Sequence, residues 1–136
     1  FLPMNYERDY EPSKLVAELS GTKYIMLPEI TSFELAIGLL SRMELVVAMR
    51  LHTLLYASCS GTPTVGISYD PKITSFAKYI GSSCVPLEKA DKAALDALIQ
   101  STCGTESGAE FKASLEKLRM AEHTNLSVAE KLLEGE

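Results

Sequence analysis

Two groups of polar residues follow apolar stretches of the chain, and together they could bind an anion and move a proton. Arg50 and His52 come directly after the apolar run 45–49, and the segment 69–72, Tyr-Asp-Pro-Lys, follows a second apolar run at 64–68. Arginine pairs with carboxylates or phosphates through two parallel hydrogen bonds, and lysine adds a point charge on a flexible stem. Histidine exchanges a proton near neutral pH. These residue types predict a site for an anionic substrate whose reaction includes a proton transfer.

The elements around these residues read as strand, helix and strand. Residues 45–49 are apolar without alternation, which is typical of a strand covered on both faces in a parallel sheet. Apolar residues recur at helical spacing over 51–60, with Gly61 and Pro63 as stop signals, and 64–68 is the next strand candidate. Ligands of open α/β sheets collect outside the carboxyl ends of strands. We therefore expect both polar groups to face one crevice, where the free N–H groups of the helix start would also attract an anion.

The rest of the chain continues this alternation of strands and helices. The predicted strands lie near 1–4, 23–27, 45–49, 64–68 and 84–87, and the predicted helices near 11–19, 31–42, 51–60, 73–80 and 89–99. In helix 31–42, Thr31 and Glu34 form a capping box and Phe33 belongs to the buried stripe. The pattern predicts an α/β fold, a Rossmann-like parallel sheet with helices on both faces. It divides into a Rossmann-like domain at 1–101, a polar linker at 102–108 and a C-terminal helical segment at 109–136.

Two acidic residues follow the first two predicted strands. Asp9 lies near the end of the first strand and could reach the crevice, but an acidic residue at a helix start is favoured for capping alone, and we weight capping more heavily. Glu29 would hang at another strand end, where it could meet a substrate, or it is an exposed loop glutamate.

The central residues also have purely structural interpretations. Arg50 could pair with Asp70 or Glu29, and His52 could cap its helix. Asp70 and the proline after it could form a simple turn that leaves Lys72 exposed. From spacing alone these interpretations are at least as good as the functional ones.

Composition and cysteine content exclude several classes of protein. The net charge of −5 argues against nucleic-acid binding, and no uncharged apolar run approaches the length of a membrane span. Three widely spaced cysteines form neither a disulfide framework nor a zinc motif, and no cluster of carboxylate, His or Cys ligands calls for a metal. We expect a cytoplasmic protein. Because the chain begins at Phe1, in what reads as a strand already under way, we interpret it as a fragment of a longer protein.

The central motif resembles a known family. The run RLHTLLYA, followed by GTP, VGISYD and PK, is similar to the carboxy-terminal half of bacterial polysaccharide pyruvyltransferases, particularly the branch that decorates cell-wall polymers used to anchor S-layer proteins. The resemblance is tight over Met49 to Lys72 and looser over Phe1 to Leu87. It implies transfer of a pyruvyl group from phosphoenolpyruvate to a sugar of a cell-wall or surface polysaccharide, with ketal formation and no further cofactor.

The resemblance also implies roles for residues and partners. Arg50 and His52 would be catalytic, and Arg50, Lys72, Tyr69, Asp70 and Glu29 would bind substrate. The fold would be half of a glycosyltransferase-B arrangement, and the missing N-terminal half would hold most contacts to a lipid-linked or polymeric saccharide acceptor. The isolated fragment would then be inactive, and the whole enzyme could associate peripherally with the inner face of the membrane.

Two other interpretations stay open. The chain could be the nucleotide-sugar-binding half of a glycosyltransferase-B enzyme, in which Glu88, after the strand near 84–87, would contact a ribose. A non-catalytic receiver-like module is the weakest candidate, since it needs clustered aspartates at strand ends and only Asp9 and Asp70 are available.

Overall fold

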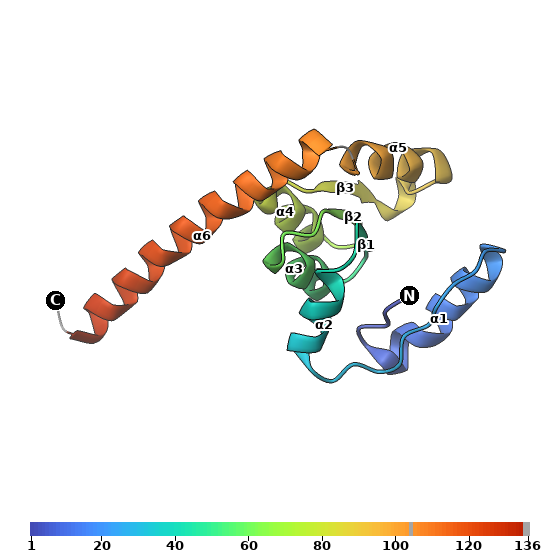
Figure 1. The fold of residues 1–136 in the computed structure, drawn as a ribbon, viewed down its shortest axis with the longest axis horizontal. Helices are drawn as coiled ribbons and strands as arrows, with labels where there is room; N and C mark the ends of the chain where they lie inside the picture. The colour runs from blue at the N-terminus through green and yellow to red at the C-terminus, as the bar shows by residue number, and fades with distance from the viewer. Residues whose placement is uncertain (104, 135–136) are drawn as a thin grey trace.

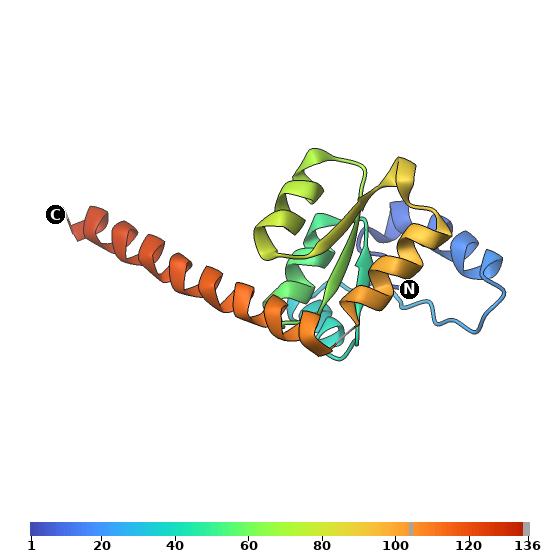
Figure 2. The same ribbon diagram turned by 90° about the horizontal axis from the view of Figure 1, so that it is seen from above.

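The computed structural model describes residues 1–103 and 105–134 and contains a three-stranded parallel sheet packed between helices (Figures 1 and 2). The strands are β1 (Val46–Ala48), β2 (Thr64–Ser68) and β3 (Ser83–Pro86). They lie side by side in the order β1-β2-β3, and the register pairs Val47 with Val65 and Gly66 with Cys84. Because all three run in the same direction, their carboxyl ends meet at one edge of the sheet.

Helices lie on both faces of this sheet. They are α1 (Tyr6–Leu19), α2 (Phe33–Leu40), α3 (Leu51–Cys59), α4 (Pro71–Ile80), a short 3-10 helix η1 (Leu87–Lys89), α5 (Lys92–Thr102) and α6 (Thr105–Glu134). Helices α3 and α4 pack on one face, α2 packs on α3, and α5 packs on β2 and β3 from the other face (Figure 2). The sequence correctly predicts an α/β fold with a parallel sheet.

The main core lies between the sheet and helices α3 and α4. Leu54 and Ala57 of α3 and Ile73 of α4 are fully buried against β1 and β2. Gly66 of β2 allows this close packing, because a Cβ atom there would lie 3.2 Å from the Cys84 Sγ and 3.5 Å from the Leu54 Cδ1. A side chain at position 66 would therefore require these neighbouring atoms to shift.

Helix α4 has clear start and stop signals. Asp70 is its N-cap, and Pro71 takes the first helical position, where a missing N–H costs nothing. Gly81 ends it with φ +70°, in the left-handed conformation that glycine adopts without strain. The predicted stop at Gly81 is confirmed.

Two of the five predicted strands do not form, which corrects the sequence interpretation. Residues 1–4 and 23–27 are irregular. Phe1 joins them: its N-terminal amino group donates to the Ile25 carbonyl at 2.6 Å, and its carbonyl accepts from the Leu27 N–H at 3.0 Å. This is the hydrogen-bond pattern of a single parallel bridge, which is too short to be a ladder.

The surroundings of β1 and α2 also differ from the predictions. Val47 is 43% exposed, so β1 is not covered on both faces. Ser32, not Thr31, caps α2 and accepts the Leu35 N–H. Phe33 is 58% exposed and does not belong to the buried stripe.

Helix α6 replaces most of the expected linker. It begins at Thr105, within the segment 102–108, and Thr102 is the buried last residue of α5; position 104 and residues 135–136 lie outside the described residues. Phe111 and Leu115 pack against Ile80 of α4. Farther along, α6 extends away from the rest of the molecule (Figure 1), and its residues 119–133 are exposed.

Candidate active site

The carboxyl ends of β1 and β2 bring the predicted arginine and tyrosine together. Arg50 is the N-cap residue of α3, with extended backbone (φ −91°, ψ 127°) and no side-chain bond to the helix. Its side chain is thus available for other contacts. Tyr69 follows β2 directly, and both residues line one cavity. The expected crevice between adjacent strand ends is present for these two residues.

Asp9 holds the guanidinium of Arg50. The Arg50 Nε donates to the Asp9 Oδ2 at 3.1 Å, and its Nη2 donates to the Asp9 Oδ1. Asp9 Oδ2 also accepts the backbone N–H of Asn5, the N-cap of α1, at 3.0 Å. The two oxygens of one carboxylate therefore serve both the helix start and the arginine.

This pair corrects one sequence interpretation and extends another. Asp70 and Glu29 were the expected structural partners of Arg50, and Asp9 takes that place. The capping role favoured for Asp9 is present, since its carboxylate accepts an N–H at the start of α1, but it does not exclude the crevice. The position of Asp9 after the first predicted strand was the signal that could have found this pair.

The charge state of the pair follows from these bonds. Burial alone would raise the pKa of Asp9, but the hydrogen bonds from Arg50 and from the Asn5 N–H, with the nearby positive charge, hold that pKa below its ordinary value. The bond to Asp9 in turn raises the pKa of Arg50, with a smaller contribution from Tyr69. Both groups are charged at neutral pH.

The larger cavity has a volume of about 810 Å³ and lies between α1, the residues before it and β1. Its lining is mostly apolar and includes the uncovered Val47. Asp9 and Arg50 are the charged side chains among the described residues that line it. The formal charges of these two side chains cancel.

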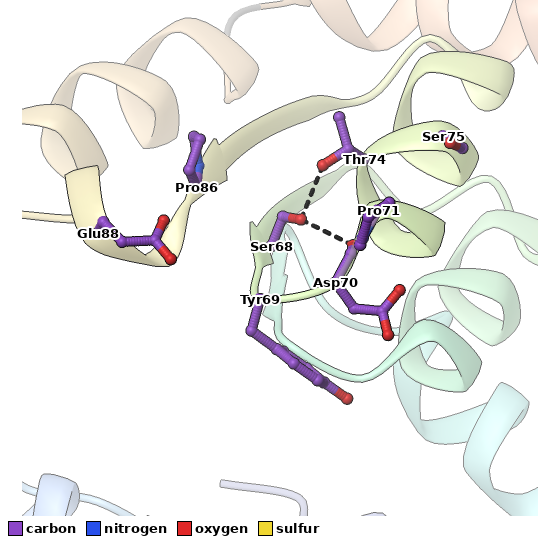
Figure 3. A pocket seen from close by; sticks show the side chains of 8 residues that line it. All are labelled: Ser68, Tyr69, Asp70, Pro71, Thr74, Ser75, Pro86 and Glu88. Carbon is purple, nitrogen blue, oxygen red and sulfur yellow. Dashed lines mark hydrogen bonds between the residues drawn. The ribbon is translucent and has the colours of Figure 1, made fainter.

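A smaller hollow of about 380 Å³ lies between the carboxyl ends of β2 and β3 (Figure 3). Its lining consists of Ser68, Tyr69, Asp70, Pro71, Thr74, Ser75, Pro86 and Glu88. The Ser68 hydroxyl donates to the Asp70 carbonyl at 3.0 Å and lies 2.7 Å from the Thr74 hydroxyl, which fixes one wall. In Figure 3 the Glu88 carboxylate extends from the β3 side toward the gap. Tyr69 lines both this hollow and the larger cavity.

Lys72 does not reach the cavity that holds Arg50. Asp70, the N-cap of α4, accepts the Lys72 N–H at 2.9 Å, and its Oδ2 lies 3.5 Å from the Lys72 Nζ. The N–H bond and the ammonium charge keep the pKa of Asp70 below its ordinary value. Asp70 thus caps α4, a role that the sequence interpretations do not assign to it. Lys72 is exposed, as the turn interpretation expects, and its side chain, 55% exposed, lines neither cavity.

His52 and Glu29 also lie outside both cavities. His52 is exposed in the first turn of α3, and its ring centroid is 6.2 Å from that of Tyr56. Glu29 is exposed in the irregular segment before α2. The structure brings together Arg50, Tyr69 and Asp9, and it leaves His52, Glu29 and Lys72 at the periphery.

The described part of the chain contains neither a metal-binding cluster nor a membrane-spanning helix. Over residues 1–103 and 111–133, no three His, Cys, Asp or Glu side chains gather where they could hold a metal ion. Cys84 is partly buried, which raises the pKa of its thiol, and Cys59 and Cys103 are exposed. No helix within these residues has both the length and the apolar character that spanning a membrane requires.

Comparison with known proteins adds one finding. A family model described as polysaccharide pyruvyl transferase matches residues 1–71, which are 71 of the 136 residues. The match includes Asp9, Arg50, His52 and Tyr69 and ends before Lys72 and Glu88. No curated protein and no solved structure matches the chain.

Proposed function

The chain belongs to the polysaccharide pyruvyl transferase family, and from this premise we propose that it binds phosphoenolpyruvate and contributes to pyruvyl transfer onto a sugar of a cell-wall or surface polysaccharide. One observation carries the proposal: Arg50 lies at the carboxyl end of β1, held by Asp9 on the wall of a cavity of about 810 Å³. A held guanidinium at a strand end suits an anion such as this donor.

Arg50 keeps donors for a ligand while it is bound to Asp9. Asp9 engages the Nε and one Nη2 hydrogen, and a guanidinium has further N–H groups on its other edge. Those groups can take the carboxylate or the phosphate of phosphoenolpyruvate through two parallel bonds. The side chain of Arg50 is 39% exposed, so the free edge is accessible.

Lys72 could supply the second positive charge that the donor needs. The charges of Asp9 and Arg50 on the cavity wall cancel, whereas the donor carries several negative charges. Lys72 has a long flexible stem and a surface ion pair with Asp70, which is weak and readily exchanged. We assign to Lys72 the donor's second anionic group, which it would reach after leaving Asp70.

The chemistry that follows is the addition of hydroxyls to an enol carbon. A proton goes to the methylene carbon of the donor, and positive charge develops at C2. A sugar hydroxyl oxygen bonds to C2, a second hydroxyl closes the ketal, and the bond from C2 to the phosphate oxygen breaks. The two hydroxyl protons end on the new methyl group and on the released phosphate. We assign one of these protons to His52, which is exposed in the first turn of α3 and lines neither cavity, so it would have to reach the reacting atoms from the open side of the site.

The acceptor side of the reaction reaches beyond these residues. We propose that the chain supplies the donor half of a glycosyltransferase-B arrangement and that a second half holds the acceptor saccharide. A lipid-linked acceptor would bring the enzyme to the inner face of the membrane. The branch that modifies cell-wall polymers for S-layer anchoring remains our proposed physiological setting.

One observation favours a second candidate, a nucleotide-sugar glycosyltransferase. Glu88 lies in the smaller hollow at the carboxyl ends of β2 and β3, where its carboxylate can accept hydrogen bonds from ribose hydroxyls. The hollow contains no cationic side chain among its lining residues, so a diphosphate would lack a partner there. We therefore rank this candidate second.

The test is a pair of NMR titrations of the chain, one with phosphoenolpyruvate and one with UDP-N-acetylglucosamine, followed through backbone amide shifts. We expect shifts at Arg50, Tyr69 and Lys72 with phosphoenolpyruvate alone, and their loss in Arg50→Ala. Shifts around Glu88 with the nucleotide sugar alone would favour the second candidate. No response to phosphoenolpyruvate in the protein with Arg50 would contradict the proposed donor site.

A further inference from the structure

We propose that Asp9 is a positioning residue for Arg50, which fixes the edge of the guanidinium that meets the anionic substrate. This inference rests on the proposed function, because it concerns the same site. The sequence favours Asp9 as a helix-capping residue, and its bond to Arg50 spans 41 positions of the chain. The role assigned here therefore comes from the folded structure.

The geometry of the pair selects one edge of the guanidinium. Both oxygens of Asp9 are engaged, one with Nε and the other with Nη2. A ligand can then reach the Nη1 side and the outer hydrogen of Nη2, but it cannot take the Nε edge without displacing Asp9. Asp9 thereby converts a guanidinium with two usable edges into one that presents a single edge.

Asp9 is itself held in place, as a positioning residue must be. Its Oδ2 accepts the Asn5 N–H at 3.0 Å, and its side chain is only 19% exposed. The Arg50 side chain is more exposed, at 39%, and has no bond to its own helix. A free arginine side chain loses considerable rotamer freedom when it binds a ligand, and a partner that orders it beforehand removes part of that cost.

Two physical effects of Asp9 on anion binding have opposite signs. As a negative charge beside Arg50, Asp9 repels an anion, so its removal alone should strengthen binding. As the group that orders Arg50, it favours binding, so its removal should weaken it. The sign of the change therefore separates positioning from a bystander ion pair.

The experiment measures phosphoenolpyruvate affinity of the chain by titration calorimetry for wild type, Asp9→Asn and Asp9→Glu. Asp9→Asn keeps the size of the side chain and one acceptor oxygen but cannot accept from both the Nε and the Nη2 of Arg50. We expect the affinity for phosphoenolpyruvate to fall by about tenfold, which is the lower end of the loss seen when a residue that orients a metal ligand is replaced. Asp9→Glu keeps the charge with a longer stem and should restore part of the loss. Glu7→Gln is the matched control, because it removes one carboxylate from the same first turn of α1 without a bond to Arg50, and it should leave the affinity within about twofold.

A second readout keeps the inference testable without the substrate. The Arg50 Nε–H signal in NMR should be slow to exchange in wild type and in Glu7→Gln, and fast in Asp9→Asn. Equal or tighter phosphoenolpyruvate binding by Asp9→Asn would overturn the inference, and so would an unchanged Nε–H exchange rate. If wild type binds no phosphoenolpyruvate while the Nε–H signal depends on Asp9, the proposed donor is wrong. Inorganic phosphate then replaces phosphoenolpyruvate as the anion in the same series of variants. A loss of phosphate affinity in Asp9→Asn supports the positioning role, and an unchanged phosphate affinity contradicts it.

Discussion

Asp70 holds Lys72 by two contacts, because its Oδ1 accepts the Lys72 N–H at 2.9 Å and its Oδ2 lies 3.5 Å from the Lys72 Nζ. The first contact caps α4, and the second places the ammonium group beside Asp70, outside the cavity that holds Arg50. One carboxylate thus stabilises the helix start and restrains a cation that the donor site would need. The two roles can be separated by substitution.

Asp70→Asn should strengthen phosphoenolpyruvate binding a few-fold. Asparagine caps helices about as well as aspartate, so α4 should keep its start, while Lys72 loses its charged partner and becomes free to contact the donor. Calorimetric titration measures the change, and the gain should vanish in the double variant Asp70→Asn, Lys72→Met. Asp70→Ala, which removes the cap as well, should cost about 0.5–2 kcal/mol of folding stability in urea denaturation. A gain in affinity that survives in the double variant would show that Lys72 is not the cation concerned.

His52→Gln should leave the affinity for phosphoenolpyruvate within about twofold, because His52 is exposed and lines neither cavity. The proposed role of His52 is proton transfer, which affects the rate of the reaction step and not the affinity for the bound substrate. His123→Gln, on the exposed part of α6, is the matched control. A tenfold loss of affinity in His52→Gln alone would instead make His52 a direct donor contact.

Acid should remove the stabilising effect of Asp9. Arg50, Arg8 and the Asn5 N–H face its carboxylate and lower its pKa against the opposing effect of burial. The pKa in the folded state lies below the unfolded value of about 3.9, so the contribution to stability is complete above that pH and is lost as the pH falls through the folded pKa. Urea denaturation of wild type and Asp9→Asn between neutral pH and about pH 3 should show a difference in unfolding free energy that shrinks below about pH 4. A difference that stays constant over this range would mean that Asp9 is not stabilised in its charged form.

Gly66→Ala should destabilise the fold by about 1–3 kcal/mol, the usual cost of overpacking a core. The new Cβ would lie 3.2 Å from the Cys84 Sγ and 3.6 Å from the Ile73 Cγ2. Gly38→Ala is a suitable control, because a Cβ at that helical position meets nothing within 4 Å and the change should stabilise α2 by about 0.5–1 kcal/mol. Thermal denaturation of both variants tests the packing around β2. Equal stabilisation by the two substitutions would contradict the close packing around position 66.

The sequence predicted the central elements well because their signals are local. Helices α3 and α4 and strand β2 are short segments between strong start and stop residues, such as Pro71 and Gly81, and these residues act through their own backbone conformation. The placement of Arg50 and Tyr69 at neighbouring strand ends followed from the parallel order alone.

Predictions from the sequence failed where the structure depends on residues that are far apart in the chain. The bond between Asp9 and Arg50 joins residues 41 positions apart, and Asp9 has a local capping role that explains it equally well from sequence. Residues 1–4 and 23–27 could form strands only through several successive hydrogen bonds to a neighbouring strand, and the spacing of apolar residues does not predict those bonds. Closeness in sequence predicts that His52 lies beside Arg50, but Arg50 precedes the helix while His52 lies on its exposed side.

The most direct test of the proposed donor site compares phosphoenolpyruvate affinity, by titration calorimetry, for wild type, Arg50→Lys and the control Arg42→Lys. Arg42 is exposed, lies beyond the end of α2 and lines neither cavity. A lysine at position 50 keeps the charge but cannot bind Asp9 and an anion through separate edges. We expect Arg50→Lys to weaken binding by at least about tenfold, the order of a charge-assisted hydrogen bond, with no change in Arg42→Lys. Equal affinities for all three proteins would contradict the assignment of Arg50 as the residue that binds the donor.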